Sequence, residues 1–298
     1  MLNNRRDADD VNEAFISCVD KWASEEFDDR IDGAIDTFEE WISKFDEREK
    51  ELLAKMLLKF DYYSKGGISK IIRSLCTESI KKYGISNANS IISVVRKKDG
   101  KHNSSYDYWM LHRWVSGLSN EIYHDSVDDI NEEYWENIRK VVYIDDCSGT
   151  GKQFVTFMKR QRKSYLDKEV ILLVIEAVEE AKLYIKSELE KEGINIKIMA
   201  YTTKEKALKS LLEEEKKMFL DMSQKRGISL KYILGFEEAE ALMAFYNNTP
   251  NDTLGLFWFT SKENNPIFPR KLEEKPQWKF DREEKIKRRR QQYEAKCR

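Results

Sequence analysis

The sequence contains few residues of the kinds that build fibrous or disulfide-linked proteins. Its 298 residues include only 4 Pro, 12 Gly and 4 Cys, which excludes collagen-like chains and disulfide scaffolds. The cysteines form no CxxC pair and have no nearby histidines at ligand spacing, so we expect no structural zinc and no other protein-held metal. We expect reduced thiols and a cytoplasmic protein. The four cysteines are Cys18, Cys76, Cys147 and Cys297.

Long apolar runs are also missing. None approaches the roughly 20 residues that a membrane-spanning helix needs, and the opening MLNNRRDADD is acidic where a signal peptide would become apolar. Apolar residues make up 41% of the chain, aromatic residues 12% and charged residues 36%, which excludes wholesale disorder. The length allows one large globular domain or two modest ones, and we expect no membrane partner.

The net charge of −2 conceals an uneven distribution. Residues 1–50 hold 7 Lys and Arg against 16 Asp and Glu, whereas residues 279–298 hold 9 against 4. A basic tail can bind nucleic acid, but a run of charges is more often a solvated face, and both interpretations stay open.

Hydrophobic periodicity predicts three regions. Residues 1–82 follow a helical pattern, and residues 83–262 alternate between strand and helix patterns. Residues 263–298 combine three prolines with a charged stretch and form a C-terminal arm and basic tail. We expect an N-terminal helical region, an α/β core and an arm.

The middle region predicts an α/β fold with a parallel sheet. Helical segments separate its apolar runs, and connections of this length are right-handed crossovers between parallel strands. The run at 170–175 is typical of a strand covered on both faces, whereas the alternation at 194–200 fits a sheet edge. The predicted strands are 91–95, 141–144, 170–175, 194–200 and 254–259, with later helices at 204–224 and 237–245.

The most informative segment follows the second predicted strand. Two adjacent carboxylates, Asp145 and Asp146, stand where parallel sheets place their ligand crevice. A loop of small residues then enters a helix, so its backbone N–H groups can converge on an anion, with hydroxyl donors beside them. A bound phosphomonoester is therefore expected. The predicted phosphate-binding residues are Cys147, Ser148, Gly149, Thr150, Gly151 and Lys152.

Three other phosphate motifs fit this segment poorly. A Walker A loop needs glycine where Asp146 stands and a hydroxyl where Gln153 stands. A dinucleotide fingerprint needs glycine at the position of Phe154. A haloacid-dehalogenase-type phosphatase needs a second aspartate where Ser148 stands.

Eleven consecutive positions, residues 141–151, resemble the ribose-phosphate loop of type I phosphoribosyltransferases: four apolar residues, two acids, two variable residues, a small residue, Thr and Gly. The resemblance implies that fold. It also implies that Asp145 and Asp146 hold the ribose hydroxyls of phosphoribosyl pyrophosphate or a nucleotide and act in catalysis, while residues 147–151 hold the 5′-phosphate with Thr150 as a side-chain donor. Lys152 and Gln153 depart from the family pattern.

A narrower resemblance covers most of the chain. D-D-x-S-G-T-G-K at 145–152, the Ser104-Ser105 pair and N-T-P-N-D-T-x-x-x-F-W near the C-terminus resemble phosphoribosyltransferase-like proteins of bacterial anti-phage defence gene clusters, some of them beside retron reverse transcriptases. The resemblance implies a defence context, with another defence protein such as a reverse transcriptase complex as a partner. It does not imply a reaction.

Transfer from a ribosyl pyrophosphate needs a second anion site, usually with Mg²⁺ bridging pyrophosphate and ribose oxygens. Lys101, Ser104 and Ser105 are the candidates, because they follow a predicted strand and lead into a helix; an ordinary polar loop is the alternative. Acceptor-side candidates are Asn248, Thr249 and Asn251, although ligand-free Asx turns also explain these residue types.

Two functions follow as hypotheses. The chain is either a Mg²⁺-dependent enzyme that transfers or cleaves at a phosphoribosyl group, or a catalytically silent module that senses a nucleotide or binds a partner with the same fold.

Overall fold

The computed structural model describes residues 11–22, 28–96 and 104–270. Its centre is a sheet of five strands in the order β3-β2-β4-β5-β6, and every neighbouring pair is parallel. The predicted parallel α/β sheet is therefore confirmed. The strands are β2 (Ser90–Val94), β3 (Tyr123–His124), β4 (Lys140–Ser148), β5 (Glu169–Val178) and β6 (Asn195–Lys204).

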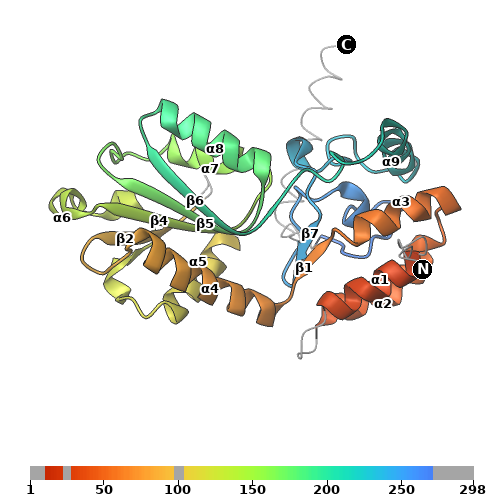
Figure 1. The fold of residues 1–298 in the computed structure, drawn as a ribbon, viewed down its shortest axis with the longest axis horizontal. Coiled ribbons are helices and arrows are strands. Elements are labelled where there is room, and N and C mark those ends of the chain that lie inside the picture. The colour runs from red at the N-terminus through yellow and green to blue at the C-terminus, as the bar shows by residue number, and fades with distance from the viewer. Residues whose placement is uncertain (1–10, 23–27, 97–103, 271–298) are drawn as a thin grey trace, which may run out of the picture.

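Helices cover both faces of this sheet (Figure 1). On one face, Ile92, Ile144 and Leu173 pack with apolar residues of α4 and α5. On the other, Tyr143 and Leu172 pack with residues of α6, α7 and α8. β4 and β5 are buried on both sides, as their continuous apolar runs predict. The helices are α4 (Lys65–Tyr83), α5 (Ser104–Val115), α6 (Glu132–Asn137), α7 (Lys152–Met158) and α8 (Glu179–Lys191).

The strand order creates a switch point between β2 and β4. After β2 the chain passes to β3 on one side of the sheet, whereas after β4 it passes to β5 and β6 on the other. The connections after β2 and β4 therefore leave in opposite directions. In open parallel sheets the ligand crevice lies at the carboxyl ends of two such strands.

A second lobe packs beside the sheet. It contains α1 (Val11–Trp22), α2 (Asp29–Ile42), α3 (Glu47–Leu57) and α9 (Glu213–Lys225), together with a two-stranded parallel sheet. That sheet pairs β1 (Asp61–Tyr63) with β7 (Met243–Phe245). Figure 1 shows that segments from both ends of the chain build this lobe.

One hydrophobic core holds the second lobe together. It joins buried residues of 11–62 with buried residues of 207–268. The ring of Trp41 packs at 5.8 Å from that of Phe257, and the ring of Phe60 stacks at 5.2 Å on that of Phe268. The division at residues 82 and 262 stays a prediction, and this core crosses both of those boundaries.

Two predicted elements near the C-terminus are wrong. Residues 237–245, predicted as a helix, form a 3-10 turn at Phe236–Glu238 and then β7. Residues 254–259, predicted as a strand, contain a 3-10 turn at Gly255–Phe257. Glu237, Glu238 and Glu240 have positive φ, which no continuous helix allows. Residues 241–245 and 254–258 are short buried runs, and periodicity cannot separate strand from helix in such runs.

The predicted helix at 204–224 is shorter than expected, because β6 extends to Lys204 and α9 begins at Glu213. The cysteines Cys18, Cys76 and Cys147 are free thiols. None of the helices in the described part of the chain has the length and apolar character that a bilayer crossing requires.

Candidate functional site

The acidic pair lies near the carboxyl end of a buried strand. β4 continues through Asp145 and Asp146 to Ser148, and Asp145 lies opposite Val174 of β5 in the parallel register. The side chain of Asp145 is buried, with 7% exposed, whereas Asp146 is partly exposed. The backbone N–H of Asp146 donates to Asp145 Oδ1 at 3.0 Å, and the N–H of Cys147 donates to Asp146 Oδ1 at 2.8 Å.

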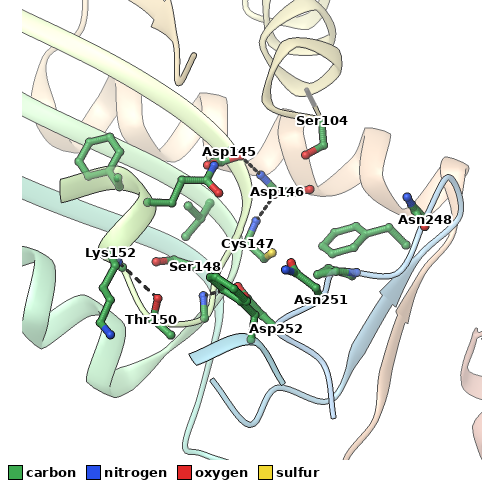
Figure 2. A pocket seen from close by; sticks show the side chains of 18 of the residues that line it. Ser104, Asp145, Asp146, Cys147, Ser148, Thr150, Lys152, Asn248, Asn251 and Asp252 are labelled. Carbon is green, nitrogen blue, oxygen red and sulfur yellow. Dashed lines mark hydrogen bonds between the residues drawn. The ribbon is translucent and has the colours of Figure 1, made fainter. Parts of the chain in front are cut away.

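These two carboxylates lie in one pocket with the loop that follows them. The pocket has a volume of about 950 Å³, and both acids and all of residues 147–152 line it. Neither acid forms an ion pair with any described Lys or Arg. Figure 2 shows residues of the second lobe facing the loop across the pocket, with Ser104 of α5 at its upper edge. Residues of the second lobe thus form one side of the pocket at the switch point of the sheet.

Burial and mutual repulsion control the charge of the acidic pair. Burial raises the pKa of Asp145 well above its usual range, and the adjacent charge of Asp146 raises it further. The shift favours a proton on the Asp145 carboxyl, beside the carboxylate of Asp146. The pair can therefore both donate and accept hydrogen bonds, which suits vicinal hydroxyl groups. Burial raises the pKa of the Cys147 thiol, and the charge of Asp146 raises it further, so this cysteine is a poor nucleophile.

Gly151 makes the loop turn into α7. Its φ of +75° lies in the left-handed region that glycine adopts without strain. A Cβ atom here would lie 2.7 Å from Ile185 Cγ1 and 2.8 Å from the backbone oxygen of Ala181, both on α8. The loop therefore packs directly on the neighbouring helix.

Replacing Gly151 with alanine is expected to lower the free energy of unfolding by about 2 to 3 kcal/mol, from left-handed strain and the contact with α8. Urea unfolding at neutral pH measures it. Gly33→Ala in α2 is the matched control, because a Cβ there meets nothing within 4 Å. Gly33→Ala should be neutral or stabilising. Equal losses in both variants would contradict this view of the loop.

The side chains after the acidic pair take different directions. Thr150 Oγ1 accepts a hydrogen bond from the Lys152 backbone N–H at 3.4 Å. The Lys152 ammonium lies 3.4 Å from Glu237 of the second lobe, and its side chain is 52% exposed. Lys152 thus bridges the two lobes at the pocket rim, where its charge is screened by solvent.

The pyrophosphate-side candidates separate in the structure. Ser104 lines the pocket at the start of α5. Ser105 does not: it is fully buried, where its hydroxyl donates to Ile144 O at 2.6 Å and accepts from the Val95 N–H at 3.2 Å. The Ser105 hydroxyl thus connects α5 to the sheet, and the side chain does not face the pocket. Lys101 lies outside the described residues.

The acceptor-side candidates all line the pocket. The Asn248 Oδ1 atom accepts from the N–H of the next residue, Thr249, at 2.9 Å, whereas an Asx turn would bond the N–H two residues on. The Thr249 hydroxyl is buried, donates to Phe268 O at 2.9 Å and accepts from Arg30 at 2.7 Å. Asn251 accepts from the Phe236 N–H through its backbone oxygen at 2.7 Å. Contacts with Phe268, Arg30 and Phe236 of the second lobe therefore hold the turn in place.

Several residues that line the pocket were not predicted from the sequence. The most informative is Asp252, whose Oδ2 accepts a hydrogen bond from the Gly149 N–H at 3.2 Å. Burial is the main cause that raises the pKa of Asp252 to about 6, and the charge of Asp146 adds to it. Asp252 belongs to the same N-T-P-N-D-T motif, but no local pattern connects it with a loop 103 positions earlier. The polar pocket residues missed include Asp107, Arg160, Asn247, Asp252 and Arg270.

The protein thus has a parallel sheet with an acidic pair and a small-residue loop at its switch point. The model of the family described as PRTase-CE matches residues 38–270, which is more than half of the chain. The chain belongs to this family.

Other comparisons add little. The Helicobacter pylori xanthine-guanine-hypoxanthine phosphoribosyltransferase is similar in structure with 11% sequence identity and a TM-score of 0.31, over 48% of this chain and 84% of that chain. No curated protein matches the chain. The assignment therefore rests on the observed sheet and on the family match.

Proposed function

We propose that the pocket binds a ribose 5-phosphate group, as part of phosphoribosyl pyrophosphate or of a nucleotide. The observation that carries the proposal is that both acids and the whole of the following loop line a single pocket of about 950 Å³. This volume suits a nucleotide-sized ligand.

The pair Asp145 and Asp146 is proposed to hold the two vicinal ribose hydroxyls. A carboxylate accepts hydrogen bonds from hydroxyl groups, and a protonated neighbour can donate one in return. Backbone N–H groups of 147–151, with the Thr150 hydroxyl, are proposed to hold the phosphate oxygens.

Magnesium is proposed to arrive with the substrate as its pyrophosphate complex. The described residues contain no group of three or more His, Cys, Asp or Glu side chains placed to hold a metal ion. Mg²⁺ commonly takes most of its ligands from phosphate oxygens and water, so a dedicated protein cage is not required. When bound, the ion would neutralise charge on the leaving pyrophosphate.

Incubation of the purified protein with Mg²⁺ and phosphoribosyl pyrophosphate or nucleotides tests for an enzyme. The readouts are released pyrophosphate and free base. Sustained release that vanishes in Asp146→Asn supports catalysis, whereas no release over many hours at saturating ligand excludes it for those substrates.

A silent binding module is the second candidate, and the lack of a suitable general base at His112 favours it. His112 is buried, its ring nitrogen lies 2.8 Å from the Tyr123 hydroxyl, and burial lowers its pKa to about 4, so it is no general base for this pocket. Tight binding of a nucleotide with no turnover is the result expected of a module.

We further propose that the protein acts in the cytoplasm as an effector of an anti-phage defence system, together with another defence protein. The resemblance of residues 104–105, 145–152 and 248–258 supports this context, and the free thiols suit a reducing compartment. Phage plating on cells with the wild-type or Asp146→Asn gene tests it. Contact of the basic tail with nucleic acid concerns residues outside the described part.

A further inference from the structure

A carboxylate of the second lobe contacts the backbone of the loop at residues 147–151. Asp252 Oδ2 accepts the Gly149 N–H at 3.2 Å. A Cβ atom on Gly149 would lie 2.4 Å from the same oxygen, so the carboxylate packs against the loop backbone itself. The glycine at this position therefore leaves room for Asp252.

The backbone of Asp252 is held firmly by its own lobe. Its backbone oxygen accepts from the Ala241 N–H at 3.1 Å, and the next residue, Thr253, donates its hydroxyl to Met243 O at 2.7 Å. Gly235, at φ +75°, packs so closely on Asp252 that a Cβ would lie 2.1 Å from that backbone oxygen. The carboxylate can therefore leave the loop only by rotation of its side chain or by movement of the whole lobe.

The surroundings of Asp252 are mostly acidic. Asp146 of β4 and Glu237 of the second lobe disfavour its charge, whereas the Gly149 N–H and Arg270 favour it. The charge of Asp252 in turn raises the pKa of Asp145. The thiol of Cys147 on β4 also interacts with it. At neutral pH the Asp252 carboxyl is mostly ionised, because its pKa is about 6. An incoming phosphate would meet this negative charge at an N–H group that it needs.

We propose that the Asp252 carboxylate is an internal competitor of phosphate, which holds the Gly149 N–H until a ligand phosphate displaces it. The inference rests on the proposed ribose-phosphate function and adds regulation to it. Because Asp252 belongs to the second lobe, any partner that shifts this lobe away from the sheet would open the loop to phosphate.

Calorimetric titration with ribose 5-phosphate at pH 7.5 tests the competition. Asp252→Asn keeps the shape but removes the charge, and Asp252→Ala removes the acceptor as well. Both variants are expected to bind about tenfold more tightly than the wild type. Asp221→Asn, an exposed change on α9, is the charge-matched control and should bind like the wild type. The advantage of Asp252→Asn should shrink at pH 5, where Asp252 is protonated in the wild type.

The outcomes separate the two proposals. If the wild type binds and the Asp252 variants bind equally or more weakly, the competitor role is wrong and the ribose-phosphate site stands. If neither the wild type nor the variants bind, both are wrong.

A measurement without ligand is independent of folding losses in the variants and of the proposed function. The Gly149 amide resonance of the wild type should shift with a midpoint near pH 6, as its acceptor titrates. A Gly149 amide that does not respond between pH 5 and pH 7.5 would overturn the contact on which the inference depends.

Discussion

Asp146→Asn is expected to weaken the binding of ribose 5-phosphate roughly 100-fold, since it removes charge-assisted hydrogen bonds to a sugar hydroxyl. Asp146 is the more exposed member of the acidic pair, and both members line the pocket. Replacing its carboxylate by an amide also places an N–H donor where an acceptor is needed. Isothermal titration calorimetry measures the effect.

Two controls make the Asp146 result specific. The melting temperature of Asp146→Asn should stay close to that of the wild type, since its side-chain oxygen can still accept the Cys147 N–H. Asp221→Asn changes the net charge equally at an exposed site and should bind normally. Unchanged affinity in Asp146→Asn would refute the assignment of the acidic pair.

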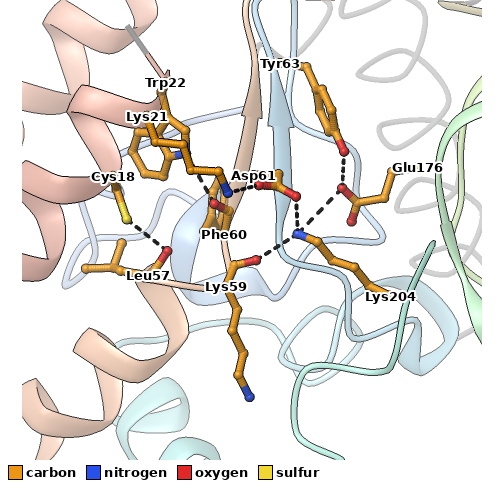
Figure 3. Close-up of polar contacts among 10 residues, drawn as sticks. All are labelled: Cys18, Lys21, Trp22, Leu57, Lys59, Phe60, Asp61, Tyr63, Glu176 and Lys204. Atoms are coloured by element: carbon orange, nitrogen blue, oxygen red, sulfur yellow. Dashed lines mark hydrogen bonds and ion pairs between the residues drawn. The ribbon is translucent and has the colours of Figure 1, made fainter. Parts of the chain in front are cut away.

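A buried glutamate lies where the two lobes meet. Glu176, on β5, is 1% exposed, and its Oε2 atom accepts the Tyr63 hydroxyl at 2.6 Å. The Lys204 ammonium lies 3.7 Å from the same oxygen and 2.6 Å from Asp61, which also pairs with Lys21 (Figure 3). Glu176 Oε1 accepts no hydrogen bond from the described residues. The cluster joins β1 of one lobe to β5 and β6 of the other.

Burial raises the pKa of Glu176 from 4.5 to about 7, although Lys204 and Tyr63 oppose the shift. The folded protein thus binds a proton that the unfolded chain releases at lower pH. The stabilising contribution of the protonated form is complete below pH 4.5 and is lost as the pH rises through 7. This group alone should lower the free energy of unfolding by about 3 kcal/mol across that range.

Glu176→Gln, which mimics the protonated form, should lack this pH dependence. The stability of the variant relative to the wild type is therefore expected to improve by about 3 kcal/mol between pH 4.5 and pH 8. Urea unfolding at both values measures it, with exposed Glu214→Gln on α9 as the control. If the wild type and Glu176→Gln follow the same pH profile, Glu176 is not the titrating group.

The parallel sheet could be predicted because its strands are locally distinct. The runs at 141–144 and 170–175 are continuously apolar, and 194–200 alternates as an edge strand does, which is where β6 lies. Gly193 lies just after α8 with φ +73°, the left-handed conformation that favours glycine after a helix. These signals arise within a few residues and need no knowledge of distant contacts.

The second lobe could not be predicted in this way. β1 and β7 are three residues each and exist because they pair across 182 positions of sequence, Asp61 with Met243. The contact of Asp252 with Gly149 likewise depends on how the lobes pack. Ser105 has the residue type of a ligand contact, but its burial against Ile144 appears only in the folded chain.

A crystal structure with ribose 5-phosphate bound tests the central claim most directly. We expect the phosphate within hydrogen-bond distance of backbone N–H groups of 147–151, and the two ribose hydroxyls on Asp145 and Asp146. Asp252 should then have turned away from Gly149. Ligand density in another part of the protein, or an empty pocket at saturating ligand, would contradict the account.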